Sequence, residues 1–244
     1  MHAKKACGWM SRALAALLAA AVLPAGCTAQ APQSADFESG YLAPAAGKAP
    51  SFSVTYIQYA VEEQDLIERA WAKAEPPGDA AAALWTANGL RIGRADGQAA
   101  TEVQAILDRA TTVRAKKRDL VMPTGQPFEA AVGRAVAAMG LVYATKDATE
   151  YRDVASFQLM LKVMAVGVGE DARVSVSPFF YSGPETNATI MEGLEESFPF
   201  GGKTAILIGP VREPAASKLG SLFLRADGTK RSATLVVIEP RASR

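Results

Sequence analysis

Histidine and cysteine, the side chains on which most catalytic triads and zinc sites depend, are scarce in this chain. The one histidine is His2 and the two cysteines are Cys7 and Cys27, so residues 28–244 contain neither type. A Ser-His-Asp triad, a Cys-His pair, a His- or Cys-ligated zinc site and a disulfide are therefore excluded from that part of the chain. Carboxylate chemistry, lysine nucleophiles and oxygen-ligated metals remain open.

Acidic residues gather in two stretches, and carboxylate clusters can serve acid–base chemistry or bind Ca²⁺. The first stretch is Glu62, Glu63 and Asp65, and the second is Glu185, Glu192, Glu195 and Glu196. The first stretch leads into a predicted helix, where negative charge complements the helix dipole. The second lacks the spacing of a calcium-binding loop, which favours a solvated loop or strand edge. We expect no metal and no cofactor.

Two short motifs suggest chemistry that their surroundings do not support. Gly201-Gly202-Lys203-Thr204 is similar to the end of a phosphate-binding loop, but that pattern needs a glycine at position 197, where the chain has Ser197. The motif should also open a helix, whereas residues 205–208 are strand-like, so a hairpin turn is the favoured interpretation. Asn187-Ala188-Thr189 matches a glycosylation acceptor only formally.

Aromatic residues form two local clusters in predicted strands and loops. These are Phe179-Phe180-Tyr181 and Phe198-Pro199-Phe200. Core packing is the favoured role, and an exposed contact patch for a partner is the alternative. We expect Trp71 and Trp85 to anchor the core of the N-terminal region.

The N-terminal segment has the features of an export signal. Lys4, Lys5 and Arg12 make it basic, no acidic residue precedes Cys27, and residues 13–23 form an apolar run of 11 residues. That run is too short to span a bilayer, which needs about 20 residues. Small residues follow in Leu23-Pro24-Ala25-Gly26-Cys27. We therefore predict a signal peptide over residues 1–26; an ordinary secretory signal cleaved near Ala25 or Ala29 is the alternative.

The residues before Cys27 resemble the lipobox of bacterial lipoproteins, although Pro24 stands where that family usually has Leu. The resemblance implies acylation of the Cys27 thiol and of its new amino group, which would hold the protein stably on a membrane. Thr28 implies the outer membrane, with the protein facing the periplasm. Residues 27–50, rich in Ala, Pro, Ser, Gln and Gly, then read as the anchor and a flexible tether.

Removal of residues 1–26 takes away three of the 26 basic residues and none of the 25 acidic ones, leaving a net charge of about −2. That balance argues against a nucleic-acid partner.

The remaining chain predicts an α+β fold with two regions, because the pattern of elements changes near residue 118. In residues 51–117 we expect a small α/β layer, with strands at 52–59 and 90–93 and helices at 62–74, 80–87 and 101–115. Lys116, Lys117 and Arg118 mark a turn. In residues 118–244 we expect a predominantly antiparallel β domain, with strands at 157–165, 173–181, 204–208, 221–224 and 233–239. Residues 128–145 fit either a helix or a strand.

Residues 157–242 resemble the C-terminal part of the secretin domain, which forms channels in type II and type III secretion systems and type IV pili. The matching stretches are 157–163, 173–178, 202–209, Leu219-Gly220-Ser221-Leu222-Phe223 and 233–241. Leu219, Leu222 and Phe223 would close one end of a sheet, and Gly220 would permit a close turn. Residues 119–156 are too short and too Ala-rich for the family's membrane-spanning hairpins, so the resemblance implies the β scaffold without the pore.

Three function hypotheses follow. The first is a non-catalytic structural or scaffolding protein that contacts envelope or secretion components. The second is a lipid-anchored binding module for a small ligand or peptidoglycan. The third, which the sequence favours least, is an enzyme using carboxylates or lysine.

Overall fold

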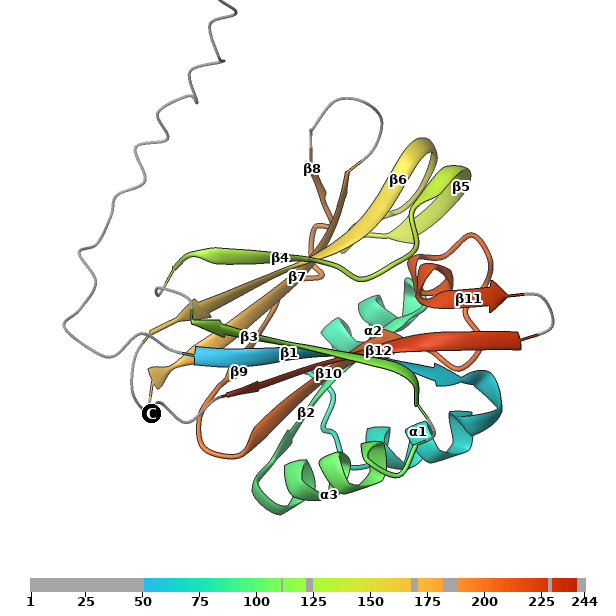
Figure 1. The fold of residues 1–244 in the computed structure, drawn as a ribbon. Helices are drawn as coiled ribbons and strands as arrows, with labels where there is room; N and C mark the ends of the chain where they lie inside the picture. The colour runs from blue at the N-terminus through green and yellow to red at the C-terminus, as the bar shows by residue number, and fades with distance from the viewer. Residues whose placement is uncertain are drawn as a thin grey trace, which may run out of the picture. The chain divides into compact units, whose positions relative to one another are not determined.

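The computed structural model describes residues 51–110, 112–121, 125–167, 171–181, 188–227 and 230–240. These residues build three layers: α1 and α3 lie on one face of a sheet, and a second sheet packs on its other face (Figure 1). Cys27, the signal peptide and the tether lie outside the described residues. The α+β class dominated by antiparallel β structure is confirmed.

The first sheet, sheet A, has six strands in the order β2-β10-β12-β1-β3, with β11 also paired to β12. Its strands are β1 (Ser51–Ala60), β2 (Leu90–Asp96), β3 (Thr112–Val121), β10 (Thr204–Pro210), β11 (Leu224–Asp227) and β12 (Lys230–Pro240). The second sheet, sheet B, has the order β4-β6-β7-β8, with β5 paired to β6 and β9 to β7. Its strands are β4 (Pro127–Ala131), β5 (Val136–Ala144), β6 (Thr149–Val166), β7 (Arg173–Tyr181), β8 (Ala188–Ile190) and β9 (Glu196–Pro199).

Alternation along the strands of sheet A produces two hydrophobic cores. Phe52 and Val54 of β1 face sheet B and pack with Leu161 of β6, whereas Ile57 and Tyr59 face the helices. The helices α1 (Gln64–Trp71) and α3 (Gly97–Leu107) cover that second face. Their buried residues recur at helical spacing and include Ile67, Ala70 and Trp71 in α1 and Val103, Ile106 and Leu107 in α3. The third helix, α2 (Asp79–Ala87), contributes Trp85 to the core between the sheets.

A close contact of two glycines joins the turn after α2 to the 3-10 turn η3 (Leu219–Phe223). A Cβ atom on Gly220 would lie 1.7 Å from the carbonyl oxygen of Gly89, and Gly89 itself has φ +72°. Only glycine fits at Gly220, as the sequence predicts, but the cause is this backbone contact. Leu219, Leu222 and Phe223 are fully buried in the core between the sheets.

The fully buried side chain of Asn88 closes the free edge of β5. Its Nδ2 donates to the carbonyl oxygens of Leu84 (3.0 Å) and Ala144 (2.9 Å), and its Oδ1 accepts from the Ala144 amide (2.9 Å). Two residues earlier, the Val142 amide donates to Ser217 O at 2.9 Å. The β5–β6 hairpin is thereby attached to the α2–β2 turn.

The predicted boundary between residues 117 and 118 does not separate two compact units. β1 lies between β12 and β3, with Phe52 opposite Pro240 and Leu120, so strands from both predicted regions share one sheet. Contacts across the boundary group the described residues into a single unit. The local composition changes at residue 118, but strand pairing over this distance leaves no local signal.

Three predicted elements differ from the structure. The helix predicted at 101–115 spans Gly97–Leu107, and the Lys116–Arg118 turn is instead part of β3. The strand predicted at 221–224 is mainly the 3-10 turn η3. Residues 128–145, which fitted either a helix or a strand, form β4 and β5, and β5 pairs with the first part of β6. The expectation that residues 119–156 lack the membrane-spanning hairpins of secretins stays a prediction.

Candidate functional site: a cationic groove between the sheets

The described glutamates of residues 185–196, which are Glu192, Glu195 and Glu196, are not placed to hold a metal ion together. Glu195 accepts a hydrogen bond from Ser175 Oγ at 2.8 Å, Glu192 is exposed, and burial raises the pKa of Glu196 in β9. Glu185 lies outside the described residues. Within the described ranges, no three His, Cys, Asp or Glu side chains are placed to hold a metal ion.

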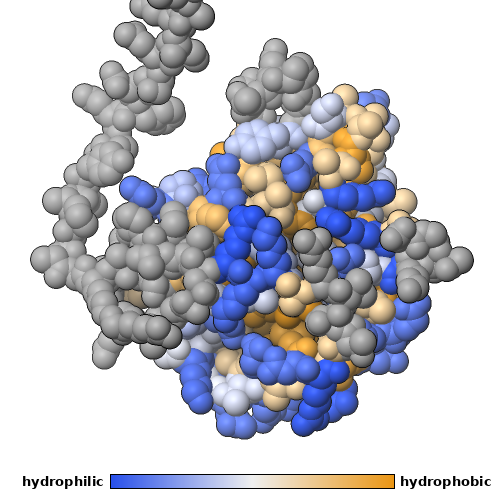
Figure 2. All heavy atoms as spheres, in the orientation of Figure 1, coloured by the Kyte–Doolittle hydropathy of each residue, from blue (hydrophilic) through white to orange (hydrophobic). Residues whose placement is uncertain are grey.

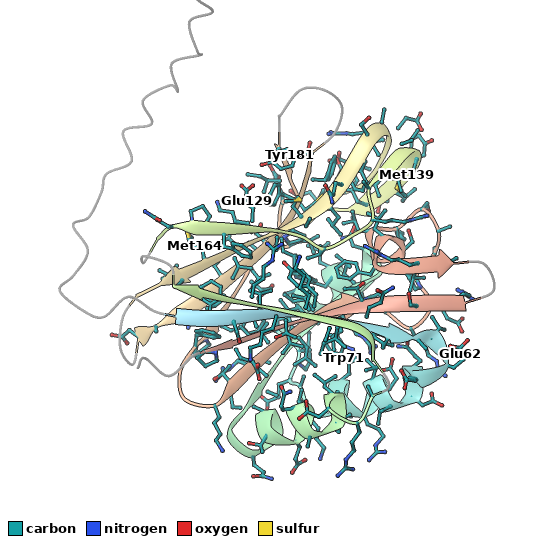
Figure 3. The ribbon with its side chains drawn as sticks, in the orientation of Figure 1. Glu62, Trp71, Glu129, Met139, Met164 and Tyr181 are labelled. Carbon is teal, nitrogen blue, oxygen red and sulfur yellow. The ribbon has the colours of Figure 1, made fainter. Side chains whose placement is uncertain are left out.

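The acidic residues before α1 are at a helix start, as the sequence predicts. Asp65 lies in the first turn of α1 and pairs with Arg212 at 3.0 Å, and Glu62 is exposed. Figure 3 shows Glu62 on the side of the molecule that carries the helices, away from Glu129 and Tyr181.

The Gly201–Thr204 motif is a turn that leads into β10. Gly202 has φ +58°, and Thr204 Oγ1 lies 2.7 Å from Gly201 O and 3.0 Å from Asp96 Oδ1. A strand follows instead of a helix, so the motif is not a phosphate-binding loop of that pattern. The predicted turn is present, but it is not a hairpin, because β9 pairs with β7 of sheet B and β10 with β2 and β12 of sheet A.

The aromatic clusters belong mainly to the core. Phe180, Phe198, Phe200 and Trp85 are buried in the core between the sheets, and Trp71 is buried in the core under the helices. Phe179 is also buried, but it points to the outer face of sheet B. Trp71 also stacks against the guanidinium of Arg91 at 4.4 Å, and Arg91 pairs with both carboxylate oxygens of Glu68 at 2.6 Å. These residues hold α1 on sheet A. The predicted core role is confirmed for Phe180, Phe198, Phe200, Trp71 and Trp85, and it is wrong for Phe179, which lies in neither core.

A groove of about 380 Å³ lies between sheet A and the edge of sheet B. One wall is the face of sheet A that points toward sheet B, with Tyr56 and Gln58 of β1 and Lys116 and Arg118 of β3. The facing wall comes from β4, β6 and the turn after β4, and includes Glu129, Gly133 and Met160. Figure 2 shows hydrophilic side chains gathered between β3 and β4 on this face.

Three cationic side chains from two different strands line this groove. They are Lys116 and Arg118 of β3 and Arg225 of β11, and all three are exposed. Among the described residues, no ion pair within 4.0 Å involves any of them. With Glu129 as the one carboxylate in the lining, the groove carries an excess of positive charge.

Neutral polar groups complete the lining. Burial raises the pKa of the Tyr56 hydroxyl, an effect that the positive charge of Arg118 partly offsets, so the hydroxyl remains a donor at neutral pH. The Gln58 amide donates to Ser232 Oγ at 2.7 Å, which fixes its orientation. Glu129 accepts a hydrogen bond from the Tyr181 hydroxyl at 2.9 Å, and Figure 3 shows these two side chains close together.

The sequence did contain a signal for this groove. In a strand, alternate residues share a face, so Lys116 and Arg118 point to one side of β3 and Lys117 to the other. The run Lys116-Lys117-Arg118 instead suggested a turn, because it follows a helical pattern. The contribution of Arg225 depends on the pairing of β11 with β12, which is not visible in local sequence.

Within the part of the chain that the structure describes, no helix is both long and apolar enough to cross a membrane. No protein-family model, curated protein or solved structure matches the chain. The function is therefore argued from the geometry of the groove.

Proposed function

We propose that this chain is a non-catalytic, lipid-anchored binding module of the bacterial envelope, and that the groove between the sheets binds an anionic ligand of the peptidoglycan type. Attachment through Cys27 to the outer membrane, facing the periplasm, is part of this proposal. The observation that supports it most is the convergence of Lys116, Arg118 and Arg225 on one groove without ion-pair partners among the described residues.

The chemistry of the lining favours a ligand with carboxylates, amides and hydroxyls. Cationic side chains form charge-assisted hydrogen bonds to carboxylates. Tyr56, Gln58 and Thr234 add neutral polar groups along the same wall. A volume of about 380 Å³ lies within the usual range for small-ligand sites, roughly 300–1,000 Å³. Peptidoglycan combines these groups, because its stem peptides carry carboxylates and amides and its glycan carries hydroxyls and amides.

Edge protection is the competing explanation for the charges of β3. Charged residues on an edge strand prevent sheets from pairing with one another, and β3 is an edge strand of sheet A. That explanation applies equally to Lys117, which lies on the other face. β11 pairs only with β12 and is an edge strand as well, but edge protection does not require Arg225 to line the same groove as Lys116 and Arg118.

Cosedimentation of the full chain with purified peptidoglycan sacculi tests the proposal. We expect Lys116→Ala, Arg118→Ala and Arg225→Ala each to weaken binding by about ten- to a hundredfold, the effect of losing a charge-assisted hydrogen bond. Lys117→Ala is the matched control, because it removes an adjacent charge from the opposite face. Added salt should also weaken binding.

Two results would refute the proposal. One is a triple variant of Lys116, Arg118 and Arg225 that sediments like the parent chain. The other is an equal loss for Lys117→Ala, which would indicate a nonspecific effect of net charge. The structural or scaffolding role linked to a secretion or pilus-type assembly, based on the secretin resemblance, stays a prediction.

A further inference from the structure

A second pocket lies on the outer face of sheet B, the face that points away from sheet A. Its volume is about 160 Å³, and its charged and polar lining comprises Glu129, Lys162, Ser175, Ser177 and Glu195. Glu129 lies at the edge of sheet B and lines both this pocket and the groove. The other charged residues of the two sites are different.

Strand register orders the lining into three rows across the sheet. In the first row, Met164 lies opposite Ser175, whose hydroxyl donates to Glu195 at 2.8 Å. In the second row, Lys162 lies between Glu129 and Ser177. In the third row, Phe179 lies beside Ile190. Adjacent rows are two residues apart along each strand, which is about 7 Å.

The residues at the base of this pocket are more buried than is usual on the outer face of a sheet. Ser175, Ser177 and Phe179 are only 7%, 8% and 4% exposed, although their side chains point away from the core between the sheets. A solvated strand face would leave such residues open to water. Because the two serine hydroxyls and the Phe179 ring are buried below charged side chains, this part of the outer face forms a concave pocket.

The charges around the hollow are not paired with one another. Lys162 lies directly opposite Glu129 in the register, yet no ion pair within 4.0 Å between described residues involves it. Each carboxylate instead accepts a hydrogen bond from a hydroxyl: Glu129 from Tyr181 and Glu195 from Ser175. A cation and a carboxylate are thus held in neighbouring rows, each able to take an external partner.

From this arrangement we propose that the pocket binds a free apolar α-amino acid, with its carboxylate on Lys162 and its ammonium group on Glu195. The carboxylate and the ammonium group of the amino acid would each form a charge-assisted hydrogen bond of about 2.8 Å. The ligand and these two bonds together span a distance of the order of one row spacing, which is the separation of the rows that hold Lys162 and Glu195. Met164, Phe179 and Ile190 supply apolar surface for the ligand's side chain. This proposal does not depend on the ligand of the groove.

Saturation-transfer NMR on the full chain, with leucine as the probe, tests the proposal. We expect leucine to bind with a dissociation constant of about 1 mM or below. N-acetylleucine lacks the ammonium group and leucinamide lacks the carboxylate, so each should bind about ten- to a hundredfold more weakly. A mixture of the other proteinogenic amino acids is measured in parallel.

Two substitutions assign the ends of the ligand. Lys162→Met should weaken the binding of leucine but leave that of leucinamide unchanged, because leucinamide has already lost the group that Lys162 holds. Glu195→Gln should weaken leucine but leave N-acetylleucine unchanged. Lys203→Met and Glu192→Gln remove exposed charges outside the pocket and serve as matched controls.

The proposal is overturned if neither leucine nor the amino-acid mixture shows saturation transfer. It is also overturned if Lys162→Met leaves leucine binding unchanged, or weakens leucine and leucinamide equally. Urea unfolding of each variant checks that the fold is retained. The Lys116, Arg118 and Arg225 variants of the groove should bind leucine like the parent chain, so failure of either proposal can be told from failure of the other.

Discussion

Replacement of Asn88 by Ala should weaken the attachment of β5 to the α2–β2 turn and so destabilise the fold. The substitution removes three hydrogen bonds, a part-buried one to Leu84 O and two buried ones to the backbone of Ala144. Because Asn88 is 0% exposed and Ala144 only 8%, water cannot easily replace the lost partner. At about 1 kcal/mol for each bond, with unsatisfied groups costing more, the free energy of unfolding should fall by about 3–5 kcal/mol.

Urea unfolding of the parent chain and the variant measures that difference, since ΔG falls linearly with denaturant. In thermal unfolding the same loss corresponds to a decrease in Tm of about 6–20 °C for a domain of this size. Thr86→Ala, at an exposed position two residues earlier, is the control and should change stability by no more than about 0.5 kcal/mol. A loss below about 1 kcal/mol for Asn88→Ala would refute the role assigned to this side chain. Hydrogen exchange should also accelerate at the Ala144 amide.

Three further predictions concern other parts of the chain. Gly220→Ala should lower stability by more than about 4 kcal/mol in urea unfolding, because its Cβ would overlap Gly89 O, whereas Gly201→Ala, with no atom within 4 Å of the new Cβ, should be neutral. Burial raises the pKa of Glu239, with Asp108 adding to the rise and Lys117 opposing it. Because the folded state favours the protonated carboxyl group of Glu239, this group's contribution to stability is fully present below its unfolded pKa of about 4.3 and is lost as pH rises through the higher folded pKa. Glu239→Gln should therefore stabilise the fold at pH 7 and not at acidic pH. Cys27→Ser should move the protein from the membrane to the soluble fraction; a variant that stays in the membrane fraction contradicts the lipid anchor.

Strands with clear alternation could be predicted from the sequence, and pairings between distant strands could not. The apolar alternation of β1, β7 and β12 is local, so each was predicted close to its observed position. β3 was not predicted, because an edge strand can carry charges on both faces and then lacks the apolar alternation that identifies a strand. Partner choice is a property of the whole chain: β1 pairs with β12, and no local pattern in residues 51–60 identifies that partner.

The same limit applies to the candidate sites. Lys162 and Glu195 are separated by 33 positions and become neighbours only through the β6–β7 register and the Ser175–Glu195 hydrogen bond. The sequence did single out Glu195, but as a member of an acidic cluster that the structure does not form. The groove similarly requires the pairing of β11, which was predicted only in part, with β12, because that pairing places Arg225 in the same groove as Lys116 and Arg118.

Both candidate sites lie beside β4, and this position has a physical reason. β4 is an edge strand of five residues, so the side chains around it can be polar without burying an unpaired charge in the core. Substitutions at exposed groove residues such as Arg118 should therefore alter stability by no more than about 0.5 kcal/mol. Substitutions at Asn88 or Gly220, which line neither pocket, should destabilise the fold strongly. Loss of binding without loss of stability in the first group would separate a ligand-binding role from a purely structural one.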